Sequence, residues 1–312
     1  MSIYREKPLN FAGLKTVPLA GRQAKVRLKE FGKPYRGGGV RGFVDSLPKI
    51  LGAEQLRGLE AAIRAAKRGR HAILWGLGGH VIKCGLAPVL AHLMERGFVT
   101  AFALNGAAAI HDLEIALAGA TSEEVEQVLS DGRFGAAEET AAVFHAAVKR
   151  AAQDGVGLGE GLGRALTKSP HAKSSLLAQA YRHKLPVTVH VAIGTDTPHN
   201  DPRMDAGALG KATYHDFRLF AEMVRDLEGG GVYLNIGSAV LLPEVFLKAV
   251  SVVRNLGHSL KVFHTANLDF IQHYRPTRNV VERPVAGGGR GYALTGHHEI
   301  MVPLLAALLC DD

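Results

Sequence analysis

Short apolar runs alternate with longer segments of helical periodicity along most of this chain. The apolar runs are rich in β-branched residues and are bounded by glycine or polar clusters, a pattern typical of buried strands. They cover residues 72–76, 99–104, 186–193, 232–236 and 260–264. The longer segments predict helices at 53–68, 80–96, 107–117, 138–153, 172–184, 217–227, 243–256 and 300–309.

This alternation predicts the fold class. Strand–helix repeats at such spacing require parallel pairing with right-handed crossovers, so we expect an α/β, Rossmann-like layered fold with a mostly parallel sheet. Two further segments carry local signals: 121–124 has the spacing of a capping box and predicts a helix start, and the glycine-rich 155–163 predicts a loop. Ligands of such folds bind at the carboxyl ends of strands. That rule selects residues 76–83, 105–114, 194–201, 235–238 and 265–269.

Positive charge is concentrated at the start of the chain. The 312 residues include 37 Lys and Arg against 29 Asp and Glu, and residues 1–41 hold ten of the former and two of the latter. We therefore expect a basic N-terminal arm, 1–41, followed by one neutral domain, 42–312. An arm of this kind is a solvated extension, a nucleic-acid contact or a contact with a sister subunit. The arm has no zinc-finger spacing and few aromatic residues to stack on bases, which disfavours nucleic acid.

Composition excludes several classes of protein. A hydrophobic fraction of 47% excludes a disordered chain, and two cysteines cannot make a disulfide framework, which favours a reducing compartment. No apolar run approaches the roughly 18 residues of a membrane span. The first residues also lack the apolar core of a signal peptide. We expect a soluble, cytoplasmic protein without membrane contact.

A glycine cluster follows the first predicted strand and opens a helix. Gly76, Gly78 and Gly79 would let backbone amides and the helix dipole hold a phosphate group there. The spacing differs from the six-residue fingerprint of dinucleotide sites, so a tight structural turn explains these glycines equally well. The cluster alone leaves both explanations open.

Polar residues follow the second and third predicted strands. His111, Asp112 and Glu114 fall in the first turns of a helix that small residues open, so a ligand can approach its backbone. Histidine titrates near neutrality and suits general acid–base catalysis, with Asp112 and Glu114 orienting it or holding an ammonium group. Stabilisation of the helix N-terminus by acids is the alternative. Asp196 would hold ribose hydroxyls or form a turn.

Other chemistries lack their residues. The 15 histidines include no H-E-x-x-H spacing, and the adjacent His297, His298 and Glu299 point apart on a helix, so we expect no metal. Cys84 lies in an apolar helix and Cys310 near the end of the chain, which does not suit a Cys–His nucleophile. There is no G-x-S-x-G elbow and no P-loop.

From about residue 70 the chain resembles the deoxyhypusine synthase superfamily. Residues 183–186 followed by 194–196 are similar to that family's helix, strand and Thr-Asp-Gly loop. Residues 262–266 are similar to its Asn-Thr-Ala strand end, and 302–305 to its closing helix. Residues 104–119 also resemble NAD-dependent ornithine cyclodeaminase domains of archaea and cyanobacteria.

Both resemblances imply bound NAD and a deoxyhypusine synthase-like fold, and the synthase family implies a homodimer or homotetramer. The residues that the resemblance places on the cofactor are Asn105, Gly106, Asp196, Thr265, Ala266 and His297. The strand-end rule adds Gly76, Gly78, Gly79, Gly194, Thr195, Gly237 and Ser238. The synthase's imine-forming lysine has no counterpart, because the matching stretch 282–291 reads ERPVAGGGRG. The synthase's His-His pair likewise falls near Leu242-Pro243. Aminobutyl transfer by that route therefore lacks its amine nucleophile.

The leading functional expectation is an NAD-dependent enzyme that transiently oxidises a C–N bond of a small amine or amino acid to an imine. The imine carbon is electrophilic, so deamination, cyclisation or transfer can follow. Two alternatives stay open. One is an aminobutyl transferase of the synthase type with a relocated nucleophile, and the other is a non-catalytic NAD-binding protein.

Overall fold

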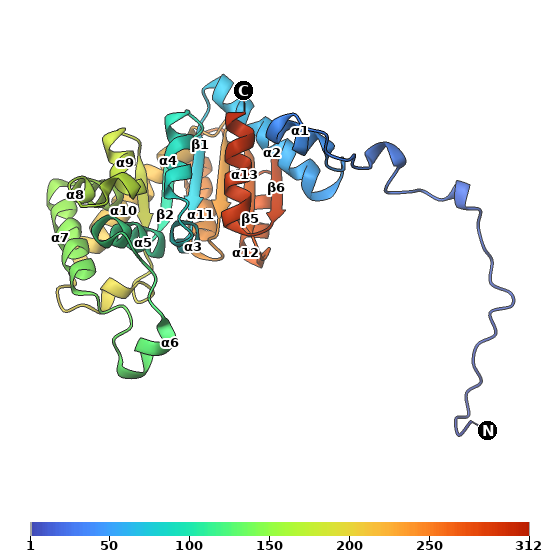
Figure 1. The fold of residues 1–312 in the computed structure, drawn as a ribbon, viewed down its shortest axis with the longest axis horizontal. Coiled ribbons are helices and arrows are strands. Elements are labelled where there is room, and N and C mark those ends of the chain that lie inside the picture. The colour runs from blue at the N-terminus through green and yellow to red at the C-terminus, as the bar shows by residue number, and fades with distance from the viewer. Residues whose placement is uncertain (1, 312) are drawn as a thin grey trace.

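A single parallel sheet organises the chain (Figure 1). A computed structural model describes residues 2–311. The strands are β1 (Ile73–Leu77), β2 (Ala101–Asn105), β3 (Val187–His190), β4 (Val232–Ile236), β5 (His264–Asp269) and β6 (Arg290–Thr295). They lie in the order β3-β2-β1-β4-β5-β6, and every neighbouring pair is parallel. The expected Rossmann-like α/β fold is confirmed.

Helices cover both faces of the sheet. The α-helices are α1 (Gly39–Ser46), α2 (Leu51–Gly69), α3 (Gly79–Lys83), α4 (Ala87–Glu95), α5 (Gly106–Ala118), α6 (Val125–Val128), α7 (Glu138–Asp154), α8 (Leu158–Leu166), α9 (Leu176–Arg182), α10 (Ala206–Arg225), α11 (Leu241–Asn255), α12 (Tyr274–Pro276) and α13 (His298–Cys310). Short 3-10 turns cover Leu19–Gly21, Leu28–Glu30, Leu129–Asp131, Ala172–Ser174 and Thr197–Asn200, and a π-helical segment, η6, covers Thr277–Glu282. One face packs on α2, α4, α5, α8, α9 and α13, and the other on α10, α11 and η6. Among the described residues no helix is long and apolar enough to cross a bilayer.

The central strands are apolar because helices bury both of their faces. All of β1 is buried, and the Trp75 indole N–H donates to the carbonyl of Phe98 at 3.0 Å. On the opposite face Tyr233 stacks on Phe246 with ring centroids 3.9 Å apart. This packing makes the sheet a rigid support for the loops at its carboxyl edge.

The fifth strand was predicted wrongly at 260–264. Leu260 and Phe263 are buried in the core, but they belong to the connection that precedes β5. The strand itself is polar at alternate positions, and these side chains are satisfied internally. The Thr265 hydroxyl donates to the carbonyl of Val280 at 2.7 Å, and Asn267 bonds to Asn235 at 2.7 Å. A hydrophobic pattern cannot detect a buried strand whose polar groups bond to one another.

Three other local predictions need correction. The predicted helix 80–96 is two helices, α3 and α4, separated by Gly85 with φ of +80°. Residues 121–124 open no capping-box helix; only the short α6 follows them. The edge strand β6 was not predicted, because its pattern alternates and glycines precede it. These errors all fall where glycine or polar residues dominate.

The glycine-rich segment 155–163 forms a helix rather than the predicted loop. Leu158, Leu162 and Leu166 make a buried stripe on α8. Its glycines permit close approach, since a Cβ on Gly159 would lie 2.0 Å from the carbonyl oxygen of Val187 in β3. Glycine here lets the helix pack directly on the strand, which explains why helix propensity was overridden.

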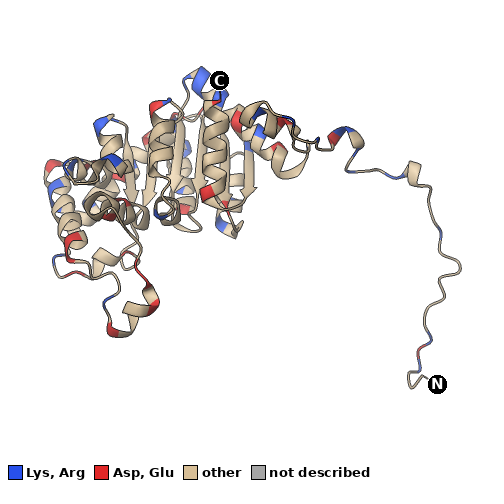
Figure 2. Cartoon of the chain, in the orientation of Figure 1, with Lys and Arg blue, Asp and Glu red and all other residues tan. Residues whose placement is uncertain are grey.

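The basic arm projects away from the domain (Figures 1 and 2). Residues 2–29 are exposed throughout, and among the described residues the first backbone hydrogen bonds to the domain come from Glu30 and Lys33. Arg41, the last residue of the predicted arm, lies inside α1, and its guanidinium donates to Glu60 at 2.9 Å. The projecting part therefore ends before α1, a few residues earlier than the sequence predicted.

Substitution of Gly159 by alanine tests the close approach of α8 to β3. We expect Gly159→Ala to lower the free energy of unfolding by about 1–3 kcal/mol, because the added methyl group overpacks the contact. Gly210→Ala is the matched control in α10, since nothing lies within 4 Å of a Cβ there. We expect that variant to be more stable by about 0.5–1 kcal/mol. Urea unfolding measures both, and a neutral Gly159→Ala would contradict the packing described here.

Removal of residues 1–26 tests the role of the arm. Its described residues, 2–26, are exposed and make no backbone hydrogen bond to the domain, so the thermal midpoint of unfolding should stay unchanged. If the arm serves assembly, as one reading of the sequence predicts, light scattering will show a smaller oligomer for the truncated chain. An unchanged oligomer together with loss of salt-dependent RNA binding would instead assign the arm to nucleic acid.

Candidate functional site

The strand order reverses between β1 and β4, which creates a switch point at the carboxyl edge of the sheet. Gly78 and Gly237 follow these two strands, and a Cβ on Gly78 would lie 1.9 Å from the carbonyl oxygen of Gly237. Ser238 is buried beside them and accepts the N–H of Leu242 at 3.2 Å. The structure thus brings together Gly78, Gly79, Gly237 and Ser238. Gly76 lies within β1, where a Cβ would meet the Tyr233 hydroxyl at 2.5 Å, so its role is packing.

A cavity of about 880 Å³ opens beside this edge. Its walls are α5, the segment 118–140 and the loop after β3. The polar groups that line it include Lys83, His111, Glu114, Thr121, Thr195 and Asp196. The volume lies in the range of small-molecule and cofactor sites, and the predicted residues His111, Glu114, Thr195 and Asp196 meet in it.

A chain of hydrogen bonds connects Glu114 to His111 through Thr121. The Thr121 hydroxyl donates to Oε2 of Glu114, and its oxygen lies 2.7 Å from Nδ1 of His111. The other Glu114 oxygen accepts from the Thr140 hydroxyl at 3.4 Å. Thr121 was predicted only as a helix cap. Its contact with residues ten and seven positions earlier leaves no signal in the sequence.

This chain fixes the protonation of His111. A threonine hydroxyl has one proton, and here it goes to Glu114, so Nδ1 of His111 must donate to the Thr121 oxygen. The neutral ring therefore keeps a free lone pair on Nε2. Burial lowers the pKa of His111, while Glu114 raises it and Lys83 lowers it. The arrangement produces a neutral base whose protonated form is stabilised by a carboxylate through Thr121.

Asp112 was predicted in the catalytic group, and the structure corrects this. Its carboxylate is fully buried and accepts the Ser175 hydroxyl at 2.6 Å and the N–H groups of Leu176 and Leu177 at 2.6 and 3.0 Å. These are the first residues of α9. Burial raises the pKa of Asp112 to about 6. The side chain anchors α9 to α5 and faces away from the cavity, because helical spacing places it on the opposite side from His111 and Glu114.

Asp196 is the acidic group with an unused acceptor. It is 8% exposed, and its Oδ2 atom has no hydrogen-bond partner in the described part of the chain. The carboxylate packs on the start of α5, since a Cβ on Gly106 would lie 1.9 Å from Oδ2. Burial raises the pKa of Asp196 to about 6. A buried carboxylate oxygen without a donor is costly, which points to a donor supplied by a ligand.

The remaining predicted residues have separate positions. Asn105 caps α5 by accepting the N–H of Ala108 at 2.9 Å, and Gly194 forms an exposed turn with φ of +92°. Thr265 and Ala266 were expected at a strand end, but they lie in the buried first half of β5, away from the carboxyl edge. That placement was wrong because β5 starts where the predicted strand ended. His297 is exposed at the start of α13 and stacks on Phe270.

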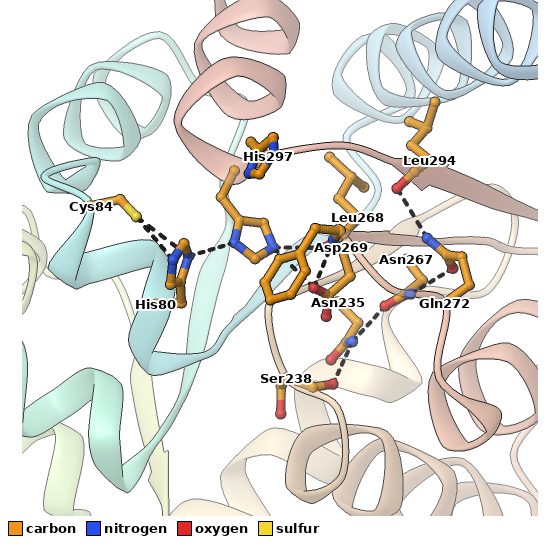
Figure 3. Close-up of polar contacts among 12 residues, drawn as sticks. His80, Cys84, Asn235, Ser238, Asn267, Leu268, Asp269, Gln272, Leu294 and His297 are labelled. Carbon is orange, nitrogen blue, oxygen red and sulfur yellow. Dashed lines mark hydrogen bonds and ion pairs between the residues drawn. The ribbon is translucent and has the colours of Figure 1, made fainter.

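Within residues 2–311, no three His, Cys, Asp or Glu side chains are grouped so that they could hold a metal ion. Some of the histidines instead make hydrogen bonds with another histidine, as His80 does with His298, with a hydroxyl, as His111 does with Thr121, or with a backbone carbonyl, as His145 does with Pro198. A second histidine cluster, around His80 and His298, lies at the switch point (Figure 3). The sequence indicated nothing there, because its members are more than 200 positions apart.

Comparison with known proteins supports the fold. No family model and no curated protein matches the chain. Among solved structures it is similar to ArgZ, an arginine dihydrolase of the ornithine–ammonia cycle in cyanobacteria, with a TM-score of 0.50 and 17% identity over 84% of this chain. It is similar to a conserved LOR/SDH protein of Methanococcus maripaludis S2, with a TM-score of 0.51 and 16% identity over 84% of this chain and 70% of that one. It is also similar to AgrE in complex with ornithine and NAD⁺, with a TM-score of 0.51 and 14% identity over 82% of this chain.

The chain spans about a third of the length of ArgZ and AgrE, 33% and 32% respectively. A deoxyhypusine synthase from Entamoeba histolytica is also matched, over 87% of this chain and 93% of that one, at 11% identity and a TM-score of 0.47. At these identities the similarity establishes the fold.

The buried carboxylate of Asp196 predicts a pH-dependent stability. The unfolded aspartate titrates near 3.9 and the folded one near 6, so the folded state binds the proton more tightly and stability falls as pH rises through this window. Above pH 6 the ionised group costs roughly 3 kcal/mol. We expect Asp196→Asn to be more stable than the wild type by about that amount at pH 7.5, and equally stable near pH 4.

Urea unfolding at the two pH values measures this difference. The exposed Asp226 provides the control, because Asp226→Asn should change stability by less than about 0.5 kcal/mol at either pH. A less stable Asp196→Asn at pH 7.5 would show that the carboxylate has a protein partner.

Proposed function

We propose that this protein binds NAD at the carboxyl edge of its sheet and oxidises a C–N bond of a small amine or amino acid to an imine. The observation that carries the proposal is the cavity in which a buried carboxylate without a donor, Asp196, faces the same space as the histidine of a Glu114–Thr121–His111 relay. A ligand with hydroxyl donors and a substrate with a removable proton together satisfy both groups. ArgZ and AgrE, which act on arginine or bind ornithine and NAD⁺, support this choice among ligands.

The residues present fit NAD. A ribose hydroxyl would donate to the unpartnered Oδ2 of Asp196. Phosphate would lie near the cavity-lining Lys83, whose charge opposes that of the phosphate. When bound there, NAD would serve as the acceptor of a hydride from the carbon that carries the amine. The protein's own contribution is to bind, orient and deprotonate the substrate.

His111 performs the proton transfer in this proposal. Its free Nε2 takes a proton from the substrate ammonium, which leaves a lone pair on nitrogen and makes the neighbouring carbon a better hydride donor. The charge that develops on the ring is stabilised through Nδ1 by Thr121 and Glu114. Glu114 also supplies negative charge to the cavity wall, which favours a cationic substrate. The same ring can return its proton to a leaving nitrogen.

An aminobutyl transferase is the second candidate, and the lysine that favours it is Lys83. This side chain lines the cavity, whereas the stretch 282–291 offers no lysine at all. Lys211, the other candidate, donates to the carbonyl of Ala152 at 2.6 Å, away from the cavity-lining residues. A transferase would therefore require Lys83 to form the imine.

Two measurements test the leading proposal. NAD should raise the thermal midpoint in proportion to RT ln(1 + [NAD]/Kd), about 2.7 kcal/mol at a hundredfold excess over Kd. A panel containing ornithine, arginine and simple diamines should then give reduction of NAD, followed at 340 nm. We expect His111→Gln to retain the thermal shift and to lose 10²- to 10⁴-fold in rate, because it removes the base but not the cofactor contacts.

Borohydride trapping distinguishes the two candidates. Under the leading proposal, treatment with borohydride and spermidine leaves no adduct on the protein, and Lys83→Met keeps most of its rate at saturating NAD while its KM for NAD rises. An adduct mapped to Lys83 would support the transferase. No thermal shift at millimolar NAD would contradict both enzymes.

A further inference from the structure

His80 and His298, which are far apart in the sequence, meet at the switch point (Figure 3). His80 lies in the first turn of α3 and His298 at the start of α13, and their Nδ1 atoms are 2.9 Å apart. His298 is completely buried, and its Nε2 lies 3.3 Å from the carbonyl oxygen of Leu268 and 3.6 Å from Oδ1 of Asp269. His80 is half-buried. The pair therefore runs from the buried end of β5 toward the solvent side of α3.

The backbone carbonyl sets the protons of both rings. A carbonyl oxygen only accepts, so Nε2 of His298 must carry the proton that it shares with Leu268. The neutral ring of His298 then accepts at Nδ1, and the proton between the two rings belongs to Nδ1 of His80. Nε2 of His80 is left with a free lone pair. His80 is therefore a base whose tautomer is fixed by His298, and His298 is fixed in turn by a backbone carbonyl.

The neighbouring thiol does not consume this lone pair. Sγ of Cys84 lies 3.3 Å from Nδ1 and 3.5 Å from Nε2 of His80, so it faces the carbon between the two nitrogens. The thiol has another acceptor in Oε2 of Glu299 at 3.9 Å, and when its single proton is donated there the lone pair on Nε2 of His80 stays free. Burial and Glu299 raise the pKa of Cys84, which keeps it protonated. Phe270, half exposed, has its ring centroid 5.8 Å from that of His80 and covers the pair.

His80 and His111 flank the same backbone. Gly79 precedes His80, and a Cβ on Gly79 would lie 3.3 Å from Cδ2 of His111. The His111 ring therefore packs on the first turn of α3, the turn that carries His80. Two independent relays, one through Thr121 to Glu114 and one through His298 to the Leu268 carbonyl, thus end within one helical turn of each other.

We infer that His80 is a second acid–base residue, which activates water for hydrolysis of the imine, and that His298 is its positioning residue. The inference rests on the proposed function, which supplies the imine. A single base cannot remove a proton from water while it is protonated by the substrate's ammonium group. A second base whose free lone pair is set by a separate relay removes this conflict.

The proton and bond changes balance. The oxidised substrate is a protonated imine, C=NH₂⁺. The oxygen of water bonds to its carbon while His80 Nε2 takes one proton of the water, and the C=N electron pair moves to nitrogen. The C–N bond then breaks as nitrogen takes the proton held by His111 and the remaining hydroxyl proton. A carbonyl compound and ammonium leave, and His80 releases its proton to solvent. The reaction class is therefore oxidative deamination with release of ammonia.

The charged and titratable groups around His80 come from three elements besides its own. They are Cys84 and Lys83 on α3, His111 on α5, Asp269 at the end of β5, and His298 and Glu299 on α13. Variants that alter His80 without these neighbours isolate its contribution.

Nitrogen-15 NMR of the histidine rings in the ligand-free protein tests the relay without any turnover. We expect the neutral tautomer of His80 to carry its proton on Nδ1 and that of His298 on Nε2. The assignments come from loss of the signals in His80→Gln and His298→Gln. A His80 tautomer with the proton on Nε2 would overturn the inference, because no free base would remain.

Rapid mixing with the amine that reduces NAD tests the role in catalysis. We expect His80→Gln to keep a burst of NAD reduction equal to the enzyme concentration, while ammonia release falls 10²- to 10³-fold. His298→Gln keeps a donor for Leu268 and an acceptor for His80, so it should lose only about tenfold, whereas His298→Leu should match His80→Gln. The exposed His92, changed to Gln, is the control and should behave as the wild type.

The outcomes separate the two claims. Ammonia release at the wild-type rate in His80→Gln would overturn the role of His80 and leave the proposed function in place. Absence of NAD reduction in the wild type would contradict the proposed function and with it this role. Loss of both the burst and ammonia release in a folded His80→Gln would show that His80 acts before the imine forms.

Discussion

The close approach of the loops after β1 and β4 is the constraint on which the carboxyl edge depends. A Cβ on Gly78 would lie 1.9 Å from the carbonyl oxygen of Gly237, so any side chain at Gly78 would force the loops apart. Gly237 also leaves room for His298, whose Cε1 would lie 3.0 Å from a Cβ there. Moving either loop would move α3 or α13, and both helices carry histidines of the site. The backbone contact between two loops thus determines where the side chains of distant segments meet.

Three buried aspartates differ in their tertiary contacts. Asp112 accepts three hydrogen bonds at the start of α9, and Asp216 accepts the N–H groups of Gly159 and Val189, which joins α8 to β3. Each of these fixes a helix to its neighbour. One oxygen each of Asp196 and Asp216 has no donor among the described residues, but of these three aspartates it is Asp196 that lines the cavity. Burial raises the pKa of all three, so the partners and not the pKa shift distinguish their roles.

The two histidine relays follow one physical rule. Each relay ends on a group that can only accept hydrogen bonds, the Glu114 carboxylate or the Leu268 carbonyl. That acceptor determines which nitrogen of the ring in the relay carries the proton. The outermost ring keeps its lone pair on the nitrogen that faces away from the relay. Low dielectric surroundings favour the neutral rings, as the lowered pKa values of His111 and His298 indicate. Buried hydrogen bonds therefore prepare bases before any ligand arrives.

Sequence by itself determined the layered fold and the edge at which the site lies, because apolar strands that alternate with helices have few ways to pack. It also selected His111, Glu114 and Asp196, since polar residues directly after strands converge on one edge. It could not determine the role of Asp112. Consecutive residues of a helix point about 100° apart, so His111 lines the cavity while Asp112, the next residue, is buried in the core. Nor could the sequence find Thr121 or the pairing of His80 with His298. Those contacts arise only when loops and helices distant in the chain are packed together, and hydrogen bonds between such segments leave no periodic pattern in the sequence.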